Sequence, residues 1–516
     1  MMKMIKNNSK ATVHVNSIGC AHSDPEIVRM WQSHFDSLYH SNVDDISRSL
    51  FFEKLSLCDR SNNEPISIAD VCQALMSQKK SKAAGPDGIQ IEAYIHGGAR
   101  LAVHLSLLFN CFIRYNYLPM GFMDALILPL VKNKHGDLTS VDNYRAIMVS
   151  NSISKIIEGI LLHKFNELLP NNDIQFGFKS GHSTGLCTDT LKSTIDYYRS
   201  KGSHVFVCFV DFKKAFDYVN YWKLFSKLLE RNIPACFISL LAYWYSNQSV
   251  YIKWKNLISD KFGIANGTRQ GSLLSPGLFN EYISELLIAI NQSGIGCNYA
   301  GKFVNILAYA DDLVLVAPSW VGLQSLLHLL EHYSFMLDMT VNCKKTVCMI
   351  FNPICRSKAL PCNFPKFRLS NDDLQFVNSF RYLGHLISDD AYDNRDIERE
   401  IRNLFIRTNT LTRKFSNCSI SVKIMLFKSF CLCFYGIALW KKYTFGCINR
   451  LKSAYHKCIK SFFGFSRMDS MTGVLMQLGL PSFDTVMWNY RKKLSSQRAT
   501  CDNLLVKHLH SLSRCT

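Results

Sequence analysis

The stretch LAYADDLVLV, residues 307–316, places Asp311 and Asp312 side by side in an otherwise apolar, β-rich segment. An ionised carboxylate inside a buried strand is costly unless it is paired or bound to a cation. A hairpin removes this cost. We therefore predict strands at 307–309 and 313–316, with both aspartates at the tight turn between them. At such a tip the two acids either cap a solvated turn or hold a strongly positive ligand.

A third acid, Asp211, ends the apolar run HVFVCFV at residues 204–210. Such a short, Val- and Phe-rich run predicts a buried strand. An acid at the end of a buried strand needs a partner, and a metal ion is one that it could have. One acid at a strand end and an acid pair on a hairpin turn could together hold divalent metal ions.

Cations flank a second predicted hairpin, ALILPLVKNKHGDLTSVDNYRAIMV, residues 125–149, which has apolar strands on either side of a polar tip. Lys132 enters the tip and Arg145 leaves it. Arginine forks onto phosphate oxygens and lysine supplies a point charge, so this pair could close over a triphosphate. Two ordinary surface cations are an equal alternative.

Two glycine-bearing loops offer further contacts. In GTRQGS, residues 267–272, Arg269 and Gln270 lie between glycines at a predicted strand-to-helix junction, where backbone can approach a ligand closely. In QFGFKSGHST, residues 175–184, the aromatic rings could stack on a nucleic-acid strand, or simply pack within the loop.

Composition and charge indicate the kind of partner. With 516 residues, 48% hydrophobic and 19% charged, the chain can bury a large core in several subdomains. The net charge is +19, and residues 401–500 carry ten lysines and seven arginines against two aspartates. This favours a polyanion such as nucleic acid. The longest uncharged run, residues 232–252, contains Pro234, so we do not expect it to span a membrane. No membrane partner is expected.

The 19 cysteines include no C-x-x-C pair, and free thiols in a reducing compartment are expected. The last potential metal ligands are Cys501, His508, His510 and Cys515. Their spacing is not that of a familiar zinc motif, so no structural zinc is expected.

Taken in chain order, these blocks resemble the reverse transcriptases of non-LTR (LINE-type) retrotransposons. The matching blocks are KKSKAAGPDGI (79–89), LPLVKNK (128–134), NYRAI (143–147), FVDFKKAFD (209–217), GTRQGSLLSP (267–276), YADD (309–312), NCKKT (342–346) and FRYLGHLIS (380–388). The resemblance implies an α+β, right-hand polymerase fold. We expect a helical N-terminal linker region at 1–78, fingers and a palm of antiparallel sheet with helices at 79–390, and a helical basic thumb and C-terminal region at 391–516.

The resemblance also implies roles for individual residues. Asp211 and Asp311 would ligate two Mg²⁺ ions, for which Mn²⁺ may substitute, with Asp312 and the Phe212 carbonyl in support. The nucleotide would be bound by Lys132, Arg145, Phe216, Gln270 and Gly271, with the Phe216 ring rejecting a ribose 2′ hydroxyl. Lys345 is a possible general acid, and the primer grip would be Tyr382, Leu383 and Gly384.

The implied activity is RNA-directed DNA synthesis, with an RNA template, a DNA primer or target DNA, and dNTPs as partners, in the nucleus and cytoplasm. The chain is expected to be a polymerase portion without the endonuclease domain. Two alternatives stay open. A group II intron-type reverse transcriptase usually has proline where Arg269 stands, and a catalytically inactive nucleic-acid-binding remnant would keep the fold alone. One departure from the family pattern is Ala146, which replaces the usual proline.

Overall fold

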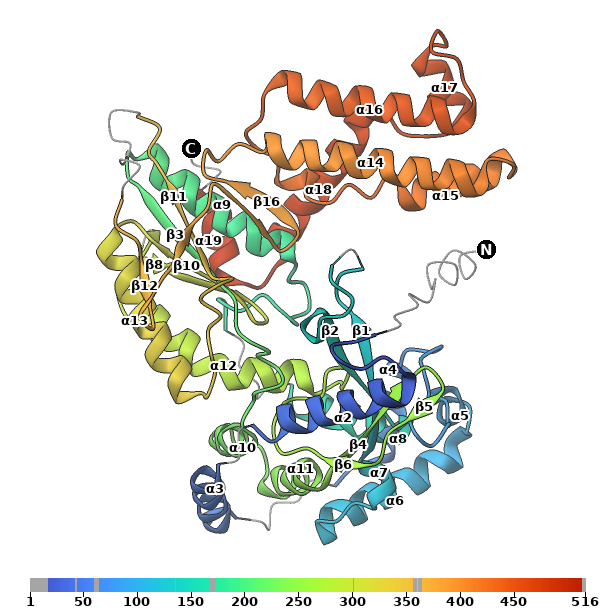
Figure 1. Cartoon of the computed structure of the whole chain (residues 1–516), viewed down its shortest axis with the longest axis vertical. Coiled ribbons are helices and arrows are strands. Elements are labelled where there is room, and N and C mark those ends of the chain that lie inside the picture. Colours follow the sequence, from blue (N-terminus) through green and yellow to red (C-terminus); the bar gives the residue numbers. More distant parts are fainter. Residues whose placement is uncertain are drawn as a thin grey trace. The chain divides into compact units, whose positions relative to one another are not determined.

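The structure is a computed structural model that describes residues 17–41, 44–59, 65–134, 136–166, 172–299, 301–355, 360 and 364–512 (Figure 1). The chain divides into two compact units. Unit 1 comprises Met1–Asn171, Lys213–Glu285 and Tyr333–Thr340, and unit 2 comprises Asn172–Phe212, Leu286–His332 and Val341–Thr516. Each unit is made of three separate segments of the chain. The predicted division into linker region, fingers and palm, and thumb stays a prediction.

Unit 1 is built on a sheet with the strand order β2-β1-β4-β5, and β6 also pairs with β4. The strands are β1 (Asp124–Val131), β2 (Tyr144–Ser150), β4 (Ser249–Trp254), β5 (Leu257–Ile258) and β6 (Phe262–Gly263). β1 and β2 are antiparallel, which confirms the predicted hairpin at 125–149, whereas β1 and β4 are parallel. Ala125 and Ile127 are buried at alternate positions of β1, as the period of a strand requires.

Helix α2 (Asp24–Tyr39) packs on this sheet. It begins at a capping box in which Ser23 and Glu26 satisfy backbone donors of the first turn. Its buried stripe includes Trp31 and Phe35, which join Tyr144 and Ala146 of β2 in one hydrophobic cluster. The ring of Trp31 lies edge-on to Tyr144, with 5.0 Å between centroids. α2 thus covers the face of β2 opposite to the exposed Arg145.

The other helices of unit 1 are α3 (Asp45–Leu57), α4 (Ile68–Ser77), α5 (Ile91–Ile95), α6 (Gly98–Tyr115), α7 (Met120–Met123), α8 (Ser152–Phe165), α10 (Tyr221–Glu230) and α11 (Ala235–Asn247), with the 3-10 turn η1 (Val141–Asn143). The chain passes between the units within α12 (Ser275–Gln292) and α13 (Trp320–Met336). Among the residues that the structure describes, no helix is both long and apolar enough to cross a bilayer.

Unit 2 is built on the strand order β14-β11-β3-β10-β9. The strands are β3 (Val205–Val210), β9 (Ile306–Tyr309), β10 (Asp312–Ala317), β11 (Val347–Phe351) and β14 (Gln375–Phe376). β3 pairs antiparallel with both β10 and β11, and every residue of β3 is buried. The apolar run before Asp211 is therefore a buried strand, as predicted, and it is also the central strand of this sheet. β14 alone departs from the expected antiparallel sheet, because it runs parallel to β11.

Three small hairpins complete the strands of unit 2: β7 (Asn298–Tyr299) with β8 (Lys302–Phe303), β12 (Arg368–Leu369) with β13 (Asp372–Asp373), and β15 (Ser379–Tyr382) with β16 (His385–Ser388). Its helices are α9 (Thr184–Ser200), α14 (Asn394–Phe415), α15 (Ile420–Phe430), α16 (Phe445–Phe463), α17 (Met471–Leu478), α18 (Phe483–Thr500) and α19 (Leu504–Leu512), with the 3-10 turn η3 (Ile437–Leu439).

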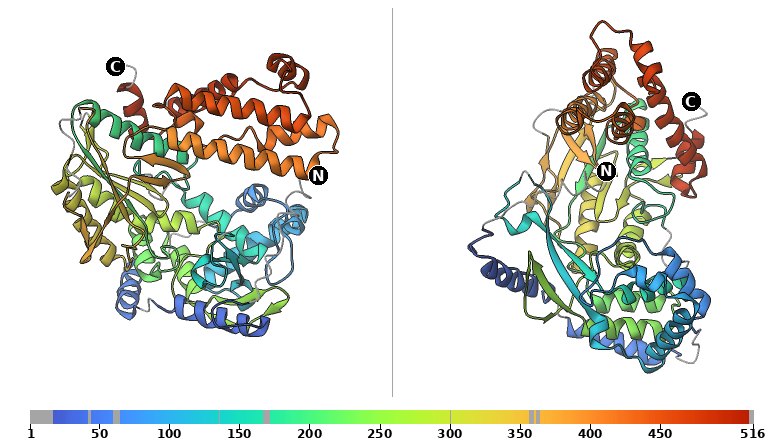
Figure 2. Two further views of the ribbon diagram at one scale, coloured as in Figure 1. Left: turned by 45° about the horizontal axis from the view of Figure 1, so that its top comes forward. Right: turned by 90° about the vertical axis from the view of Figure 1, so that its right-hand side faces the viewer.

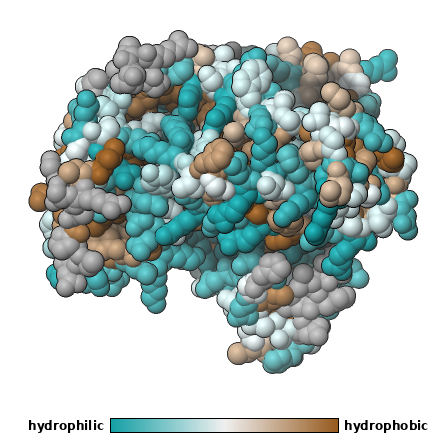
Figure 3. Space-filling view, turned by 90° about the horizontal axis from the view of Figure 1, so that it is seen from above, coloured by the Kyte–Doolittle hydropathy of each residue, from teal (hydrophilic) through white to brown (hydrophobic). Residues whose placement is uncertain are grey.

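In the part of the basic C-terminal region that the structure describes, residues 391–512, all regular structure is helical. α14 and α16 lie side by side, as the orange and red ribbons of Figure 2 show. Hydrophilic side chains predominate on the face seen in Figure 3, which is viewed from above Figure 1. Single exposed apolar residues such as Ile406 and Phe445 interrupt them. Isolated exposed apolar side chains are usual for a solvated helical surface.

Candidate active site

The turn between β9 and β10 carries the first predicted acid. It consists of Ala310 and Asp311, because Tyr309 pairs with Asp312 across the hairpin. Asp312 is therefore the first residue of β10 and not part of the turn, which corrects the prediction by one residue. A two-residue turn forces positive φ on at least one residue, and here Ala310 has a φ of 58°. Asp311 is half-buried and Asp312 is exposed.

A buried glutamine fixes this turn. The Oε1 atom of Gln175 accepts hydrogen bonds from the Ala310 N–H at 2.9 Å and the Gly177 N–H at 2.8 Å. Its Nε2 atom donates to the Ala310 carbonyl at 3.3 Å. A side chain at Gly177 would place its Cβ 2.3 Å from the Ala310 nitrogen, so only glycine fits there. The loop at 175–184 thus braces the acidic turn.

The two phenylalanines of that loop differ. Phe176 is fully buried in the core of unit 2 and its N–H donates to the Ala308 carbonyl of β9 at 2.8 Å. Phe178 is 52% exposed. Packing therefore accounts for Phe176, and of the two rings Phe178 alone faces solvent.

Asp211 is held by the turn that precedes β11. The Asn342 amide donates to Asp211 Oδ2 at 3.1 Å, and the Asn342 N–H donates to the Asp211 carbonyl at 2.7 Å. The Asp211 N–H donates to the Thr346 hydroxyl at 3.2 Å. Sequence reasoning assigned no role to Asn342 or Thr346, although both belong to the quoted block NCKKT. These contacts fix the carboxylate before any ligand binds.

Strand register brings the acids together. Val210 pairs with Leu313 in the antiparallel β3–β10 ladder, so the end of β3 and the start of β10 meet at one edge of the sheet. Asp211, directly after β3, and Asp312, the first residue of β10, both lie at that edge and line one pocket. The whole lining is Phe209, Val210, Asp211, Asp312, Leu313, Lys345, Phe380 and Tyr382. The predicted general acid Lys345 thus lies beside the predicted carboxylates, while Phe212 forms a bridge with Val341 just behind them.

The predicted primer grip is the β15–β16 hairpin. Tyr382 is 3% exposed, and its hydroxyl lies 3.3 Å from the Cys187 sulfur. Leu383 and Gly384 form the turn with φ values of 45° and 86°. The Tyr435 hydroxyl donates to the Leu383 carbonyl, and a Cβ at Gly384 would lie 2.8 Å from the Tyr435 ring. Tyr382 therefore lines the pocket, whereas Leu383 and Gly384 lie at the hairpin tip.

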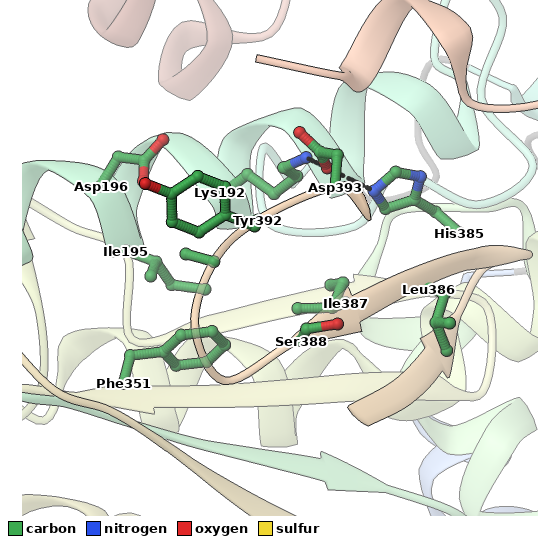
Figure 4. A pocket seen from close by; sticks show the side chains of 11 residues that line it. Lys192, Ile195, Asp196, Phe351, His385, Leu386, Ile387, Ser388, Tyr392 and Asp393 are labelled. Atoms are coloured by element: carbon green, nitrogen blue, oxygen red, sulfur yellow. Dashed lines mark hydrogen bonds and ion pairs between the residues drawn. The ribbon is translucent and has the colours of Figure 1, made fainter. Parts of the chain in front are cut away.

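A second pocket, behind this hairpin, holds a buried ionic network (Figure 4). Lys192 of α9 and His385 of β16 both point toward Asp393, and the His385 Nδ1 atom lies 3.0 Å from Asp396 Oδ2. Burial alone would raise the pKa of Asp393, but the His385 hydrogen bond and the Lys192 charge lower it below its usual range. The network connects β16 to α9 and α14, and we assign it a role in stabilising the fold.

The predicted triphosphate cations lie in unit 1. Lys132 follows β1 and Arg145 is exposed on β2, opposite Leu130. The Lys132 N–H donates to the Asn143 carbonyl at 2.7 Å, directly beyond the last β1–β2 pair, Val131 with Tyr144. The Lys132 Nζ atom donates to the Asp142 carbonyl at 2.8 Å. Ala146, next to Arg145, is buried against α2 and leaves the strand intact without the proline that the family usually has.

The loop carrying Gln270 runs beside β2. The Gln270 carbonyl accepts from the Met148 N–H at 2.8 Å. Gly271 has a φ of 124°, and a Cβ there would lie 2.6 Å from the Met148 carbonyl oxygen. Phe216 is half-buried, and its ring stacks on Phe279 with 4.1 Å between centroids. Unit 1 thus gathers the predicted nucleotide-binding residues around the β1–β2 hairpin and the 267–272 loop.

Sequence reasoning missed a buried acid in this region. Asp217 is 6% exposed and its Oδ1 atom accepts from the Gln270 Nε2 atom at 2.9 Å. Burial raises the pKa of Asp217 to about 6, although Gln270, Lys214, Tyr39 and Lys132 each oppose the rise. The available signal was its position directly after Phe216 in the block FVDFKKAFD.

This shift predicts a pH-dependent cost to stability. Because the pKa is about 6 in the folded chain and about 3.9 in an unfolded one, the free energy of unfolding falls as pH rises between these values. Asp217→Asn should therefore increase the free energy of unfolding by about 3 kcal/mol at pH 7.5 and by about half as much at pH 5. Urea unfolding at the two pH values measures this. An equal gain at both, or a loss at pH 7.5, would contradict it.

One group of possible metal ligands also comes together. Within the described residues, His182, Cys501 and Asp502 offer ligand atoms within 4.8 Å of one another. The positive Lys179 side chain interacts with both Cys501 and Asp502, which disfavours a cation there. His508 instead contacts the Tyr299 carbonyl at 2.8 Å, and Cys515 lies outside the described residues. That no structural zinc binds stays a prediction.

The sequence of the chain is similar to those of known proteins. Residues 131–387 match the family model described as reverse transcriptase (RNA-dependent DNA polymerase). The chain is 25% identical over 62% of its length to a probable RNA-directed DNA polymerase from transposon BS of Drosophila melanogaster. It is 22% identical over 86% of its length to the RNA-directed DNA polymerase from mobile element jockey of Drosophila funebris. It is 27% identical over 62% of its length to the Pol polyprotein of retrotransposable element R2 of Popillia japonica.

The chain spans about half or less of these relatives, namely 35%, 49% and 45% of their respective lengths. The matched family segment contains every predicted site residue from Lys132 to Gly384.

Proposed function

Because this chain belongs to the reverse transcriptases and its relatives come from non-LTR retrotransposons, we propose that it is an RNA-directed DNA polymerase that extends a primer 3′ end with dNTPs. The main supporting observation is the pocket in which Asp211, Asp312 and Lys345 meet beside the primer-grip residue Tyr382. The relatives are named as transposon and retrotransposon proteins, which favours this function over that of a group II intron enzyme.

The donor set suits hard divalent cations. Asp211, Asp311 and Asp312 offer carboxylate oxygens at one sheet edge, and oxygen ligands are those that Mg²⁺ and Mn²⁺ prefer. Asp211 and Asp311 would hold two Mg²⁺ ions, with Asp312 and the Phe212 carbonyl in support. When bound, such ions supply the positive charge that offsets the triphosphate and acidifies the primer hydroxyl.

The chain's own residues provide the positioning. Asn342 and Thr346 orient Asp211, while Gln175 fixes the backbone of the turn that carries Asp311. Groups held in place before the substrate arrives do not have to reorganise during the reaction. Such preorganised electrostatic stabilisation is usually the largest single contribution to catalysis. Lys345 would then give a proton to the leaving pyrophosphate.

The remaining contacts select and hold the substrates. Lys132 and Arg145 would bind the triphosphate, and the stacked Phe216 ring would exclude a ribose 2′ hydroxyl. Gln270 and Gly271 would line the nucleotide pocket. Tyr382, Leu383 and Gly384 would hold the primer end, and the basic C-terminal helices would bind the RNA–DNA backbone. From the family resemblance we further propose that this activity takes place in the nucleus and cytoplasm.

A defined RNA template tests the proposal. With all four dNTPs and Mg²⁺, the purified chain should extend an annealed DNA primer to the end of the RNA. Omitting one dNTP should stop the product one base before the complementary template position. Extension that ignores the template sequence, or that requires a DNA template, would contradict RNA-directed synthesis.

The brace at Gln175 predicts a kinetic effect. Gln175→Ala removes three hydrogen bonds and leaves the Ala310 N–H and carbonyl without those partners. We expect kcat for primer extension to fall about 10- to 100-fold, since small displacements of catalytic groups have effects of this size. The exposed Gln375, on β14, provides a matched control, and Gln375→Ala should behave as wild type. Wild-type kcat in Gln175→Ala would show that the turn does not need this brace.

A further inference from the structure

We propose that Asp217 is a positioning residue, which sets the direction of the Gln270 side-chain amide and connects the nucleotide pocket to helix α2 through Tyr39. This inference rests on the proposed polymerase function. It adds a residue that contacts no substrate and a helix, α2, that lies outside the segment matching the reverse transcriptase family model.

The contacts form a short chain within unit 1. Asp217 Oδ1 accepts from Gln270 Nε2 at 2.9 Å and from the Tyr39 hydroxyl at 3.4 Å. The Asn266 amide donates to the Asp217 carbonyl at 2.7 Å. The Tyr39 carbonyl accepts from the Ala265 and Asn266 N–H groups at 2.8 and 3.1 Å. The last residue of α2 therefore contacts both Asp217 and the loop that leads to Gln270.

The backbone around these side chains leaves little freedom. The Gly267 N–H donates to the Val219 carbonyl at 2.8 Å, and the Thr268 N–H donates to the Phe216 carbonyl at 2.7 Å. A Cβ at Gly267 would lie 2.7 Å from the Asp217 carbonyl oxygen. The loop thus packs directly against residues 216–219, and these backbone hydrogen bonds fix the position of the loop that carries Gln270 relative to Phe216.

A carboxylate dictates which end of the amide faces it. Ionised Asp217 can only accept hydrogen bonds, so the amino end of Gln270 must turn toward it and the carbonyl end must turn away. Gln270 would therefore present an acceptor, Oε1, to a donor group of the incoming nucleotide. Without Asp217, the amide could rotate and offer either end.

The surrounding charges keep the carboxylate ionised at neutral pH. Lys214 and Lys132 both attract it, and Tyr39 and Gln270 donate to it. His34 of α2 lies 3.4 Å from the Lys214 Nζ atom, and burial together with Lys214 lowers its pKa to about 4, against an opposing effect of Asp142. His34 is consequently neutral at pH 7.5, and the two lysines are the positive groups that face Asp217.

A double-mutant cycle tests whether Asp217 acts through Gln270. Primer extension on poly(rA)/oligo(dT) with Mg²⁺ would give kcat and the KM for dTTP in wild type, Asp217→Ala, Gln270→Ala and the double variant. We expect Asp217→Ala to raise KM about 10-fold or more with kcat changed less than about threefold. In the Gln270→Ala background it should add less than about twofold, because coupled residues are not additive. Asp217→Asn, which keeps an acceptor oxygen, should stay within about threefold of wild type.

A second pair of variants does not depend on the tolerance of alanine at this buried position. Gln270→Glu sets one carboxylate against another and should raise KM strongly at pH 8. Adding Asp217→Asn should restore much of the affinity, because the asparagine amide can donate to the introduced glutamate. A residue with a merely structural role would give no such rescue.

The outcomes distinguish a failure of the role proposed for Asp217 from a failure of the proposed polymerase function. Wild-type extension with an unchanged KM in Asp217→Ala, effects that multiply in the double variant, or no rescue of Gln270→Glu would each overturn the inference alone. A folded wild-type chain that extends no primer would contradict the proposed function and this inference with it.

Discussion

Asp311→Asn is expected to lower primer extension at least about a thousandfold, because it removes the negative charge that would bridge two metal ions. The amide has nearly the shape of the carboxylate, and the turn is held by hydrogen bonds between the Gln175 side chain and the Ala310 backbone. The fold should therefore survive the change. RNA binding, which we assign to the basic helical region, should stay within about twofold of wild type.

Two matched variants make this result specific. Asp312→Asn should have a smaller effect, because we propose that Asp312 only supports the metal site. Asp372→Asn should have none, because Asp372 is an exposed carboxylate of the β12–β13 hairpin, which is a separate two-stranded sheet from the one that carries Asp211 and Asp312. Filter binding of labelled RNA would be measured for all three. Near-normal extension by Asp311→Asn would contradict its assignment as a metal ligand.

Phe216→Ala should increase ribonucleotide incorporation about 10- to 100-fold relative to deoxynucleotide incorporation. The Phe216 ring stacks on Phe279, and its carbonyl accepts from the Thr268 N–H, so both ends of the residue are fixed. A ring that cannot move aside excludes a 2′ hydroxyl by volume, and alanine would open that space. The ratio of kcat/KM values for rUTP and dTTP on poly(rA)/oligo(dT) measures the effect.

Phe216→Tyr is the control for this second prediction, since it keeps the ring and adds one hydroxyl at its outer end. Its discrimination should remain close to that of wild type. An unchanged ratio in Phe216→Ala would mean that another side chain forms the gate.

Short-range pattern explains what could be predicted of the fold. The strand alternation of residues 125–149 and the uniformly apolar run before Asp211 depend on neighbours in sequence, and both became the predicted strands β1, β2 and β3. The family segment was likewise recognisable from its blocks. The error at Asp312 came from turn geometry, because periodicity alone does not show which two residues a tight turn takes.

The supporting contacts could not be predicted because they join distant positions. Gln175 lies 135 residues from Ala310, and Asp217 lies 53 residues from Gln270. No local pattern reveals such pairs. Sequence could indicate which residues are expected to carry the chemistry, through their resemblance to known blocks. The residues that contact and orient them became visible only in the folded structure.

The most direct test of the central claim is the extension of oligo(dT) on poly(rA) by the purified wild-type chain with dTTP and Mg²⁺, beside Asp311→Asn. We predict a ladder of extended products from wild type, its loss on chelation of the metal, and no products from Asp311→Asn. A folded wild-type chain that adds no nucleotides, or equal ladders from the two proteins, would contradict the claim that these carboxylates form a polymerase active site.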